Sequence, residues 1–352
     1  MNAQISFGLI GCGGIGALRA QAIARTPGAR PAAVCDVDHG RATALAQRAN
    51  AAVAADWREL VSHDDINAVI VSTPPHLHAE MCMQALAAGK DVLCEKPLAR
   101  TVAEGRDMVD TAIANGRLLA TGFNYRFYPS IRKARELLDS GMIGELDHVR
   151  SYAGYSAKDH NPQWVHDAAV MGGGALRDNG IHLIDLTRYF LGDVVEVKGF
   201  TSDSVWGFAG CEDNGFGLLR NDRGRVAALH ASWTEWAGYR FLIEIYGTRG
   251  CIRTWCFPMR TEVLWFDALG DKPRRKVFRF PLTFIKEHTG SYRALVVESF
   301  VHELQAFACA TNGDRSHVAD GIAGLQAIEI ADQIQRAAGA NSAAEPLLML
   351  PA

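Results

Sequence analysis

The first 122 residues alternate short apolar runs with amphipathic stretches of helical period. The apolar runs predict β-strands at Ile5–Ile10, Ala32–Cys35, Ala68–Ser72, Asp91–Cys94 and Leu118–Thr121. The stretches between them predict helices near Gly14–Arg25, Arg41–Ala49, Ala79–Ala88 and Val102–Ala114. Strands that alternate with helices in this way indicate a parallel sheet, so we expect an α/β domain over residues 1–123.

The pattern changes after Tyr125. Helices are predicted at Pro129–Asp139 and Asp178–Leu191. The β-type runs now follow one another with few helices between them, at Glu145–Tyr155, Val194–Thr201, Arg225–Trp233, Phe241–Tyr246 and Glu262–Phe266. This order predicts a mostly antiparallel sheet in an α+β domain over residues 124–352. Two more helices, near Tyr292–Cys309 and Val318–Ala337, close the chain.

Composition narrows the classes of partner. A chain of 352 residues is long enough for two domains with a site between them. Its 48% hydrophobic residues, 21% charged residues and formal net charge of -3 are typical of a globular protein and give no basic surface for nucleic acid. No window approaches the roughly 18 uninterrupted apolar residues of a membrane helix, and no secretory leader is recognisable. We therefore expect a cytoplasmic protein with small-molecule ligands and neither a nucleic-acid nor a membrane partner.

The eight cysteines are scattered along the chain without a CxxC pair. This distribution indicates neither a zinc site nor a disulfide framework. It is typical of buried thiols in a reducing compartment, so we predict no metal centre.

A glycine string separates the first predicted strand from the first helix. It reads Gly11-Cys12-Gly13-Gly14-Ile15-Gly16, a GxGxxG motif. In a dinucleotide-binding loop the first glycine makes a tight turn, the second lets a diphosphate approach, and the third allows close helix packing. The helix that starts at Gly14 and Ile15 would direct its free N–H groups at the diphosphate. The position predicts a Rossmann-type cofactor domain, although glycine-rich turns also serve plain strand-to-helix packing.

Asp36 ends the second predicted strand, twenty residues after Gly16. A carboxylate at this place can accept hydrogen bonds from the hydroxyl groups of the adenosine ribose, and it would repel a 2′-phosphate. We therefore predict NAD as the cofactor in preference to NADP. Arg41 lies close by and is the residue that could still allow NADP to bind. The alternative is that Arg41 is an ordinary solvated charge on the surface.

Two further polar stretches follow predicted strands. Ser72, Thr73, Pro74 and His78 come after one strand, and Glu95 and Lys96 come after the next. Ligands of open α/β sheets bind beyond the carboxyl ends of the strands, so we expect both stretches at the cofactor. Pro97 follows Lys96, which favours an extended or turn backbone and allows a cis bond. The alternative for Lys96 is an ordinary exposed lysine.

The second-domain helix carries the strongest chemical pattern. Asp178, His182 and Asp185 stand at i, i+4 and i+7, so one helix face holds two carboxylates and an imidazole. A histidine with a carboxylate partner is suited to accept a hydroxyl proton near neutral pH. The alternative is that Asp178 only caps the helix and His182 is a core residue. Three glycines, Gly172 to Gly174, precede the helix and permit close backbone approach, which favours a site.

The segment 152–170 precedes these glycines and contains groups that stack on or hydrogen-bond a sugar. Its candidate substrate contacts are Tyr155, His160 and Trp164, beside Lys96, Asp178 and His182. Tyr239 and Arg240 could also reach the cleft. Each of these residues taken singly is as well explained by a surface or packing role.

Four motifs occur in order along nearly the whole chain: GLIGCGGIG, STPPHLH, CEKP and GGGALRDNGIHLIDL. In this combination the sequence resembles the glucose-fructose oxidoreductase/inositol dehydrogenase/rhizopine-catabolism (Gfo/Idh/MocA) family. The resemblance implies a Rossmann domain, a C-terminal domain with a large open sheet, and a homodimer or homotetramer. It also implies a catalytic lysine at Lys96, a catalytic pair at Asp178 and His182, and cofactor contacts from the stretch 124–127, including Asn124 and Arg126.

The resemblance further implies hydride transfer between nicotinamide and a ring carbon of a sugar or polyol. His182 would take the hydroxyl proton, Lys96 would stabilise the oxygen, and Asp178 would orient the pair. Three alternatives stay open at this point. They are a glycosidase that uses NAD transiently in an oxidation, elimination and reduction cycle, a non-catalytic sensor of NAD or sugar, and a different Rossmann reductase resembling biliverdin reductase.

Overall fold

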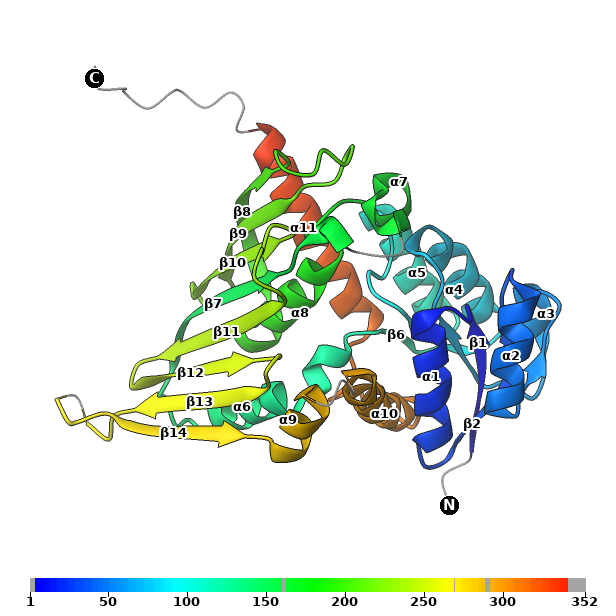
Figure 1. Ribbon diagram of the computed structural model, residues 1–352, viewed down its shortest axis with the longest axis horizontal. Helices are drawn as coiled ribbons and strands as arrows, with labels where there is room; N and C mark the ends of the chain where they lie inside the picture. The colour runs from blue at the N-terminus through cyan, green and yellow to red at the C-terminus, as the bar shows by residue number, and fades with distance from the viewer. Residues whose placement is uncertain (1–3, 160–162, 269, 289–291, 341–352) are drawn as a thin grey trace.

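The structure is a computed structural model that describes residues 4–159, 163–268, 270–288 and 292–340. Figure 1 shows the parallel sheet and its helices at one end of the molecule, the large second sheet at the other end, and helices between the two. No helix within the described residues is long and apolar enough to cross a membrane.

The N-terminal sheet has six parallel strands in the order β3-β2-β1-β4-β5-β6. Its strands are β1 (Ile5–Ile10), β2 (Ala29–Cys35), β3 (Ala52–Val53), β4 (Ala68–Val71), β5 (Asp91–Cys94) and β6 (Leu119–Thr121). The helices that follow them are α1 (Gly14–Arg25), α2 (His39–Ala49), α3 (Trp57–Ser62), α4 (His78–Ala87) and α5 (Val102–Ala114). This is the strand order of the Rossmann fold, with its switch point between β1 and β4, so the predicted α/β fold is confirmed.

Burial explains why the central strands are continuous apolar runs. Every residue of β4 is buried, as are the last five residues of β1, because helices cover both faces of the sheet. Helix α10 (Tyr292–Thr311) returns from the C-terminal part of the chain to pack on α1. Its Phe307 ring lies 6.0 Å from Phe7 of β1. A segment distant in sequence therefore contributes to the N-terminal core.

The second sheet has eight strands in the order β14-β13-β12-β11-β7-β10-β9-β8. They are β7 (Leu146–Gly154), β8 (Val194–Ser202), β9 (Asn214–Asn221), β10 (Val226–Ser232), β11 (Arg240–Gly247), β12 (Gly250–Trp255), β13 (Arg260–Trp265) and β14 (Arg274–Arg279). Only β7 and β10 pair in parallel, so the mostly antiparallel sheet is confirmed. Strands β9, β12 and β14 have no counterpart among the predicted elements.

Three helices cover one face of this sheet: α6 (Pro129–Asp139), α8 (Asn179–Leu191) and α11 (Gly321–Ala340). Figure 1 shows α8 and α11 between the sheet and the Rossmann domain. Every residue of α8 except Tyr189 is buried, including polar residues such as His182 and Asp185, which therefore need partners inside the protein. The shorter helices are η1 (Pro75–Leu77), η2 (Asn124–Phe127), η3 (Ala157–Asp159), η4 (Gln163–His166), α7 (Ala168–Met171) and α9 (Pro281–His288).

Candidate active site

The glycine string forms the turn between β1 and α1. Gly11 has φ of 95°, and a Cβ there would lie 2.6 Å from the backbone oxygen of Ser72. A Cβ at Gly16 would lie 1.9 Å from the backbone oxygen of Gly11. Both positions therefore exclude any side chain, for the packing reasons that the motif predicts.

The middle of the same loop is open. A Cβ at Gly13 or at Gly14 would meet nothing within 4 Å. Helix α1 starts at Gly14, has no acidic residue in its first turn, and lacks a side-chain cap at Gly13. Its first N–H groups and positive dipole end therefore face unfilled space, which fits the diphosphate of a dinucleotide. Ile15 is exposed beside them.

Asp36 follows β2 at the same edge of the sheet and is half-buried. One oxygen of its carboxylate accepts the backbone N–H of Cys12 at 2.6 Å, and the other accepts that of Asp38 at 2.9 Å. The carboxylate thus fixes the glycine loop and keeps lone pairs for a ribose hydroxyl group. Arg41 is exposed and pairs with Asp38 at 3.1 Å.

We predict that Asp36→Asn lowers the preference for NAD over NADP by about tenfold, because a charge-assisted hydrogen bond and a repulsive charge are both lost. The measurement is kcat/KM for each cofactor. Asp38→Asn is the matched control, since it makes the same charge change two residues away, where the side chain caps α2. An unchanged preference in Asp36→Asn would contradict the assignment.

Lys96 follows β5, and Asp178 precedes α8. The Lys96 Nζ donates to the Asp178 Oδ1 at 3.1 Å and to the Asp178 backbone oxygen at 3.1 Å. Lys96 is therefore held rather than solvated, although 23% of its side chain remains exposed. The bond between Lys96 and Pro97 is cis. The structure brings together two residues 82 positions apart, at the carboxyl edge of the parallel sheet, where β5 ends.

Asp178 occupies the N-cap position of α8, but its side chain makes no capping hydrogen bond. Its Oδ2 accepts the phenol of Tyr155 and the indole N–H of Trp233, the latter at 3.2 Å. Burial, and then the charge of Asp178, raise the pKa of Tyr155, so this phenol stays protonated and donates. The alternative in which Asp178 only caps the helix is therefore wrong.

His182 lies one helical turn further along α8 and is buried. Burial lowers its pKa well below 6.5, and the charge of Lys96 lowers it further. The charge of Asp178 acts in the opposite direction. Because the neutral form is favoured, the imidazole is ready to accept a proton. The described hydrogen bonds of the Asp178 carboxylate go to Lys96, Tyr155 and Trp233, so Asp178 orients the lysine directly and acts on His182 through charge.

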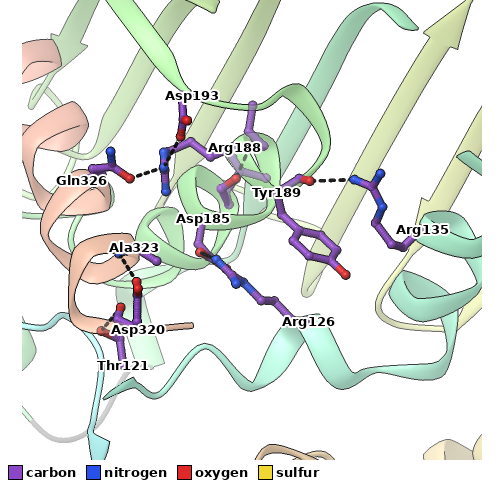
Figure 2. Close-up of polar contacts among 12 residues, drawn as sticks. Thr121, Arg126, Arg135, Asp185, Arg188, Tyr189, Asp193, Asp320, Ala323 and Gln326 are labelled. Carbon is purple, nitrogen blue, oxygen red and sulfur yellow. Dashed lines mark hydrogen bonds and ion pairs between the residues drawn. The ribbon is translucent and has the colours of Figure 1, made fainter. Parts of the chain in front are cut away.

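Two consecutive residues after β6 hold His182 and its helix in place. The ring of Tyr125 stacks on His182 with centroids 4.1 Å apart and planes 11° apart. The guanidinium of Arg126 binds both oxygens of Asp185, at 2.9 Å and 2.5 Å, as Figure 2 shows. His182 and Asp185 are three residues apart on α8. Asp185 therefore serves as an anchor for the helix rather than as a second carboxylate beside the histidine.

Figure 2 also shows how the C-terminal half of α8 is fixed. Arg188 donates to Gln326 of α11 and to Asp193, the latter at 3.3 Å. Arg135 of α6 donates to the backbone oxygen of Tyr189 at 2.9 Å. The helix that carries Asp178 and His182 is thus bound by polar contacts to both of its neighbours in the second domain.

We predict that Asp185→Asn lowers the free energy of unfolding by about 3 kcal/mol, because it leaves the Arg126 charge buried without a counterion. Asp193→Asn is the matched control. Its side chain is 79% exposed, against 1% for Asp185, so its ion pair should contribute less than about 1 kcal/mol. The measurement is urea-induced unfolding of both variants. Equal losses would show that Asp185 does not anchor α8.

Several predicted cofactor residues have other partners. His78 is fully buried, and its ring nitrogens contact the backbone oxygens of Thr73 at 2.9 Å and Pro97 at 3.0 Å. It therefore joins the two strand-end segments, and its contact with a cofactor stays a prediction for which the structure leaves no ring nitrogen without a partner. Ser72, Thr73 and Pro74 remain half-buried beside Gly11.

Glu95 and Asn124 face the helices rather than open space. Glu95 accepts from the fully buried Arg19 of α1 at 2.7 Å. Arg19 also pairs with Glu303 of α10, where burial raises the carboxyl pKa to about 7. Asn124 donates to Ser299 of α10 at 2.8 Å. Arg19, Glu303 and Ser299 were not predicted from the sequence. The one sequence feature that could have indicated this cluster is the charged residue Arg19 on the apolar face of α1.

The predicted substrate residues are only partly gathered. Tyr155 contacts Asp178, and Trp164 is partly exposed in η4. His160 lies outside the described residues. Tyr239 stacks near Tyr155 with ring centroids 6.4 Å apart and shares a hydrogen bond of 2.9 Å with the phenol of Tyr125. Trp233 was missed, because only folding brings its indole next to Asp178, which is distant in sequence.

Among the described residues, no group of three or more His, Cys, Asp or Glu side chains could hold a metal ion.

Comparisons with known proteins agree with this geometry. Residues 5–123 match the family model described as "Oxidoreductase family, NAD-binding Rossmann fold". Residues 131–253 match the "GFO/IDH/MocA C-terminal domain". The chain belongs to the Gfo/Idh/MocA oxidoreductase family. The predicted resemblance and the NAD-binding Rossmann domain are therefore confirmed.

The chain is also similar to named members of the Gfo/Idh/MocA family over most of its length. The chain is 32% identical to "Inositol 2-dehydrogenase 2" of Saccharopolyspora erythraea, over 78% of this chain and 80% of the relative. It is 30% identical to "Levoglucosan dehydrogenase" of Pseudarthrobacter phenanthrenivorans, over 64% of each chain. A solved levoglucosan dehydrogenase in complex with NADH and L-sorbose superposes with a TM-score of 0.84 at 25% identity, over 96% of this chain and 97% of that one.

Proposed function

We propose that this oxidoreductase transfers a hydride between NAD and a ring carbinol or keto carbon of a sugar, inositol or sugar derivative. The observation that carries the proposal is the meeting of Lys96, Asp178 and His182 at the carboxyl edge of the parallel sheet. Ligands of Rossmann domains bind at this edge. A held cation and a neutral imidazole beside it are the two groups that oxidation of a hydroxyl group requires.

Each of these residues has a separate task. In the oxidative direction, His182 accepts the hydroxyl proton of the substrate, since burial keeps its imidazole neutral. Lys96 donates a hydrogen bond to the same oxygen and stabilises the negative charge that develops there. Asp178 holds the lysine ammonium group in position. In the reductive direction the same two groups return the proton.

The glycine loop and Asp36 would hold the diphosphate and the adenosine ribose of NAD. When bound, NAD supplies the hydride acceptor or donor. Ile15 and the segment from Ser72 to Pro74 border the same opening. Arg126 remains a proposed cofactor contact. It would make this contact through the guanidinium N–H groups that do not bind Asp185.

The sugar class rests on two supports. Relatives of the chain are named for inositol and levoglucosan, and a solved relative is in complex with NADH and L-sorbose. The proposed substrate groups, Tyr155 beside Asp178 and Trp164 in η4, combine aromatic faces with hydrogen-bonding groups, which suits a polyhydroxylated ring.

We predict that Lys96→Ala and His182→Ala each lower kcat by about 100-fold or more, while the affinity for NAD is retained. The assay follows NADH formation with a panel of inositols, aldoses, anhydrosugars and nucleotide sugars. Lys272→Ala and His302→Ala are the controls, since both side chains are exposed and neither belongs to the candidate site or to the second sheet face proposed below as an interface. Turnover near the wild-type rate in Lys96→Ala and His182→Ala would remove both residues from the mechanism.

We also propose that the uncovered face of the second sheet mediates a homodimer or homotetramer. Phe200 of β8 pairs directly with Phe216 of β9, and Leu218 stands two residues further along β9. All three side chains are exposed. Contiguous apolar patches of this kind are rare on monomeric proteins and mark interaction surfaces.

We expect wild-type protein to sediment as a dimer or tetramer and Leu218→Arg to shift towards the monomer, because the substitution buries an unpaired charge in the interface. The measurement is analytical ultracentrifugation. Ile113→Arg makes the same kind of change on the exposed surface of α5 and should leave the assembly unchanged. A monomeric wild type, or an unaltered Leu218→Arg, would contradict the proposed interface.

A further inference from the structure

Two tryptophans with exposed ring surface lie near the candidate active site. Trp206 stands in the connection between β8 and β9, and Trp236 stands in the connection between β10 and β11. Trp236 is 67% exposed, and Trp206 is half-exposed. Their ring centroids are 5.6 Å apart with planes at 47°, so the two indoles form one tilted aromatic surface. We call them the tryptophan pair.

The loop that carries Trp206 is held by a fully buried carboxylate. Asp213 accepts the backbone N–H groups of Val205 at 2.7 Å and of Trp206 at 3.1 Å. The indole N–H of Trp206 donates to the backbone oxygen of Trp233 at 3.1 Å. Backbone and ring are therefore both fixed, and the polar edge of the indole is satisfied. The ring also stacks beside Phe208, with centroids 6.4 Å apart, and part of its surface stays exposed.

The loop that carries Trp236 is held in the same manner. The Glu235 carboxylate accepts the phenol of Tyr152 at 2.9 Å and the backbone N–H of Ala237 at 3.3 Å. Three residues after Trp236, the phenol of Tyr239 hydrogen-bonds that of Tyr125, the residue that stacks on His182. This loop thus joins the tryptophan pair to the residues around the proposed base.

A single residue connects the pair to the proposed acid-base group. Trp233 binds Trp206 through its backbone oxygen and Asp178 through its indole N–H, at 3.1 Å and 3.2 Å. Trp233 itself is fully buried, so it links the tryptophan pair to Asp178 through the interior of the protein. The pair is thus held at a fixed position relative to Asp178.

We propose that the tryptophan pair is a subsite for a second pyranose ring, so that the substrate is a glycoside of two or more sugar units. This inference rests on the proposed function, since it names the substrate class of that site. A pyranose presents an apolar face of C–H groups that packs on an indole, and its hydroxyl groups stay in water at the rim. The bonded indole of Trp206 and the held loop of Trp236 lower the ordering cost of binding such a ring.

The test compares monosaccharides with disaccharides that carry the same ring at the non-reducing end. Two quantities are measured for each sugar: kcat/KM for NADH formation, and the dissociation constant by calorimetry with NADH-loaded protein. We expect disaccharides to bind more tightly than their monosaccharides. Trp236→Ala and Trp206→Ala should reduce that advantage by about tenfold, with kcat/KM for the monosaccharides retained.

Trp265→Ala is the matched control, because Trp265 lies at the end of β13 on the opposite part of the sheet. It should leave both quantities unchanged for every sugar. The assembly state of each variant is measured in parallel. Dissociation of the Trp236→Ala oligomer, without an effect specific to disaccharides, would overturn the proposal and identify the pair as a contact between copies of this chain.

Two further outcomes separate the inference from the proposed function. Tight disaccharide binding that depends on Trp236, without turnover of any sugar, would support the subsite and contradict the dehydrogenase. Turnover of monosaccharides with no disaccharide bound more tightly would support the dehydrogenase and overturn the subsite. An equal loss for both sugar classes in Trp236→Ala would also overturn it, since the residue would then act on the whole site.

Discussion

The contact between Lys96 and Asp178 is the constraint on which the site depends. Lys96 leaves the parallel sheet at β5, Asp178 begins the helix of the second domain, and their side chains meet at 3.1 Å. The pair is only partly buried, so its energy alone cannot hold the domains in register. That register is provided by α10, which returns to pack on α1, and by α11, which packs on α5, while the ion pair of Arg126 with Asp185 fixes α8 within the second domain.

The same arrangement sets the chemistry. His182 shares a helix with Asp178, so fixing α8 also fixes the imidazole relative to the lysine. Tyr125 covers that imidazole, and burial keeps it neutral, whereas Lys96 stays accessible to a substrate. Burial and the neighbouring lysine charge both disfavour the imidazolium form of His182. The surroundings of α8 thus keep the imidazole in the unprotonated form that a proton acceptor requires.

The parts of the fold and of the site that depend on local sequence pattern could be predicted from the sequence. The glycine loop and Asp36 could be placed because each position needs a particular backbone or charge, while Lys96, Asp178 and His182 needed the family motifs as well. Strands β9, β12 and β14 were missed because glycines and charged residues interrupt their apolar pattern. The covered ring of His78 and the partner of Arg126 were beyond reach, since both depend on contacts between segments far apart in sequence.

The most direct test of the central claim is the fate of the hydrogen on the reacting carbon. A sugar from the active panel would be labelled with deuterium at each ring carbon in turn and incubated with the protein and NAD, and the nicotinamide product would be examined by mass spectrometry and NMR. We expect one labelled position to deliver its deuterium to C4 of the nicotinamide, in proportion to the ketone formed. Product that forms without deuterium in the NADH from any labelled position would contradict it.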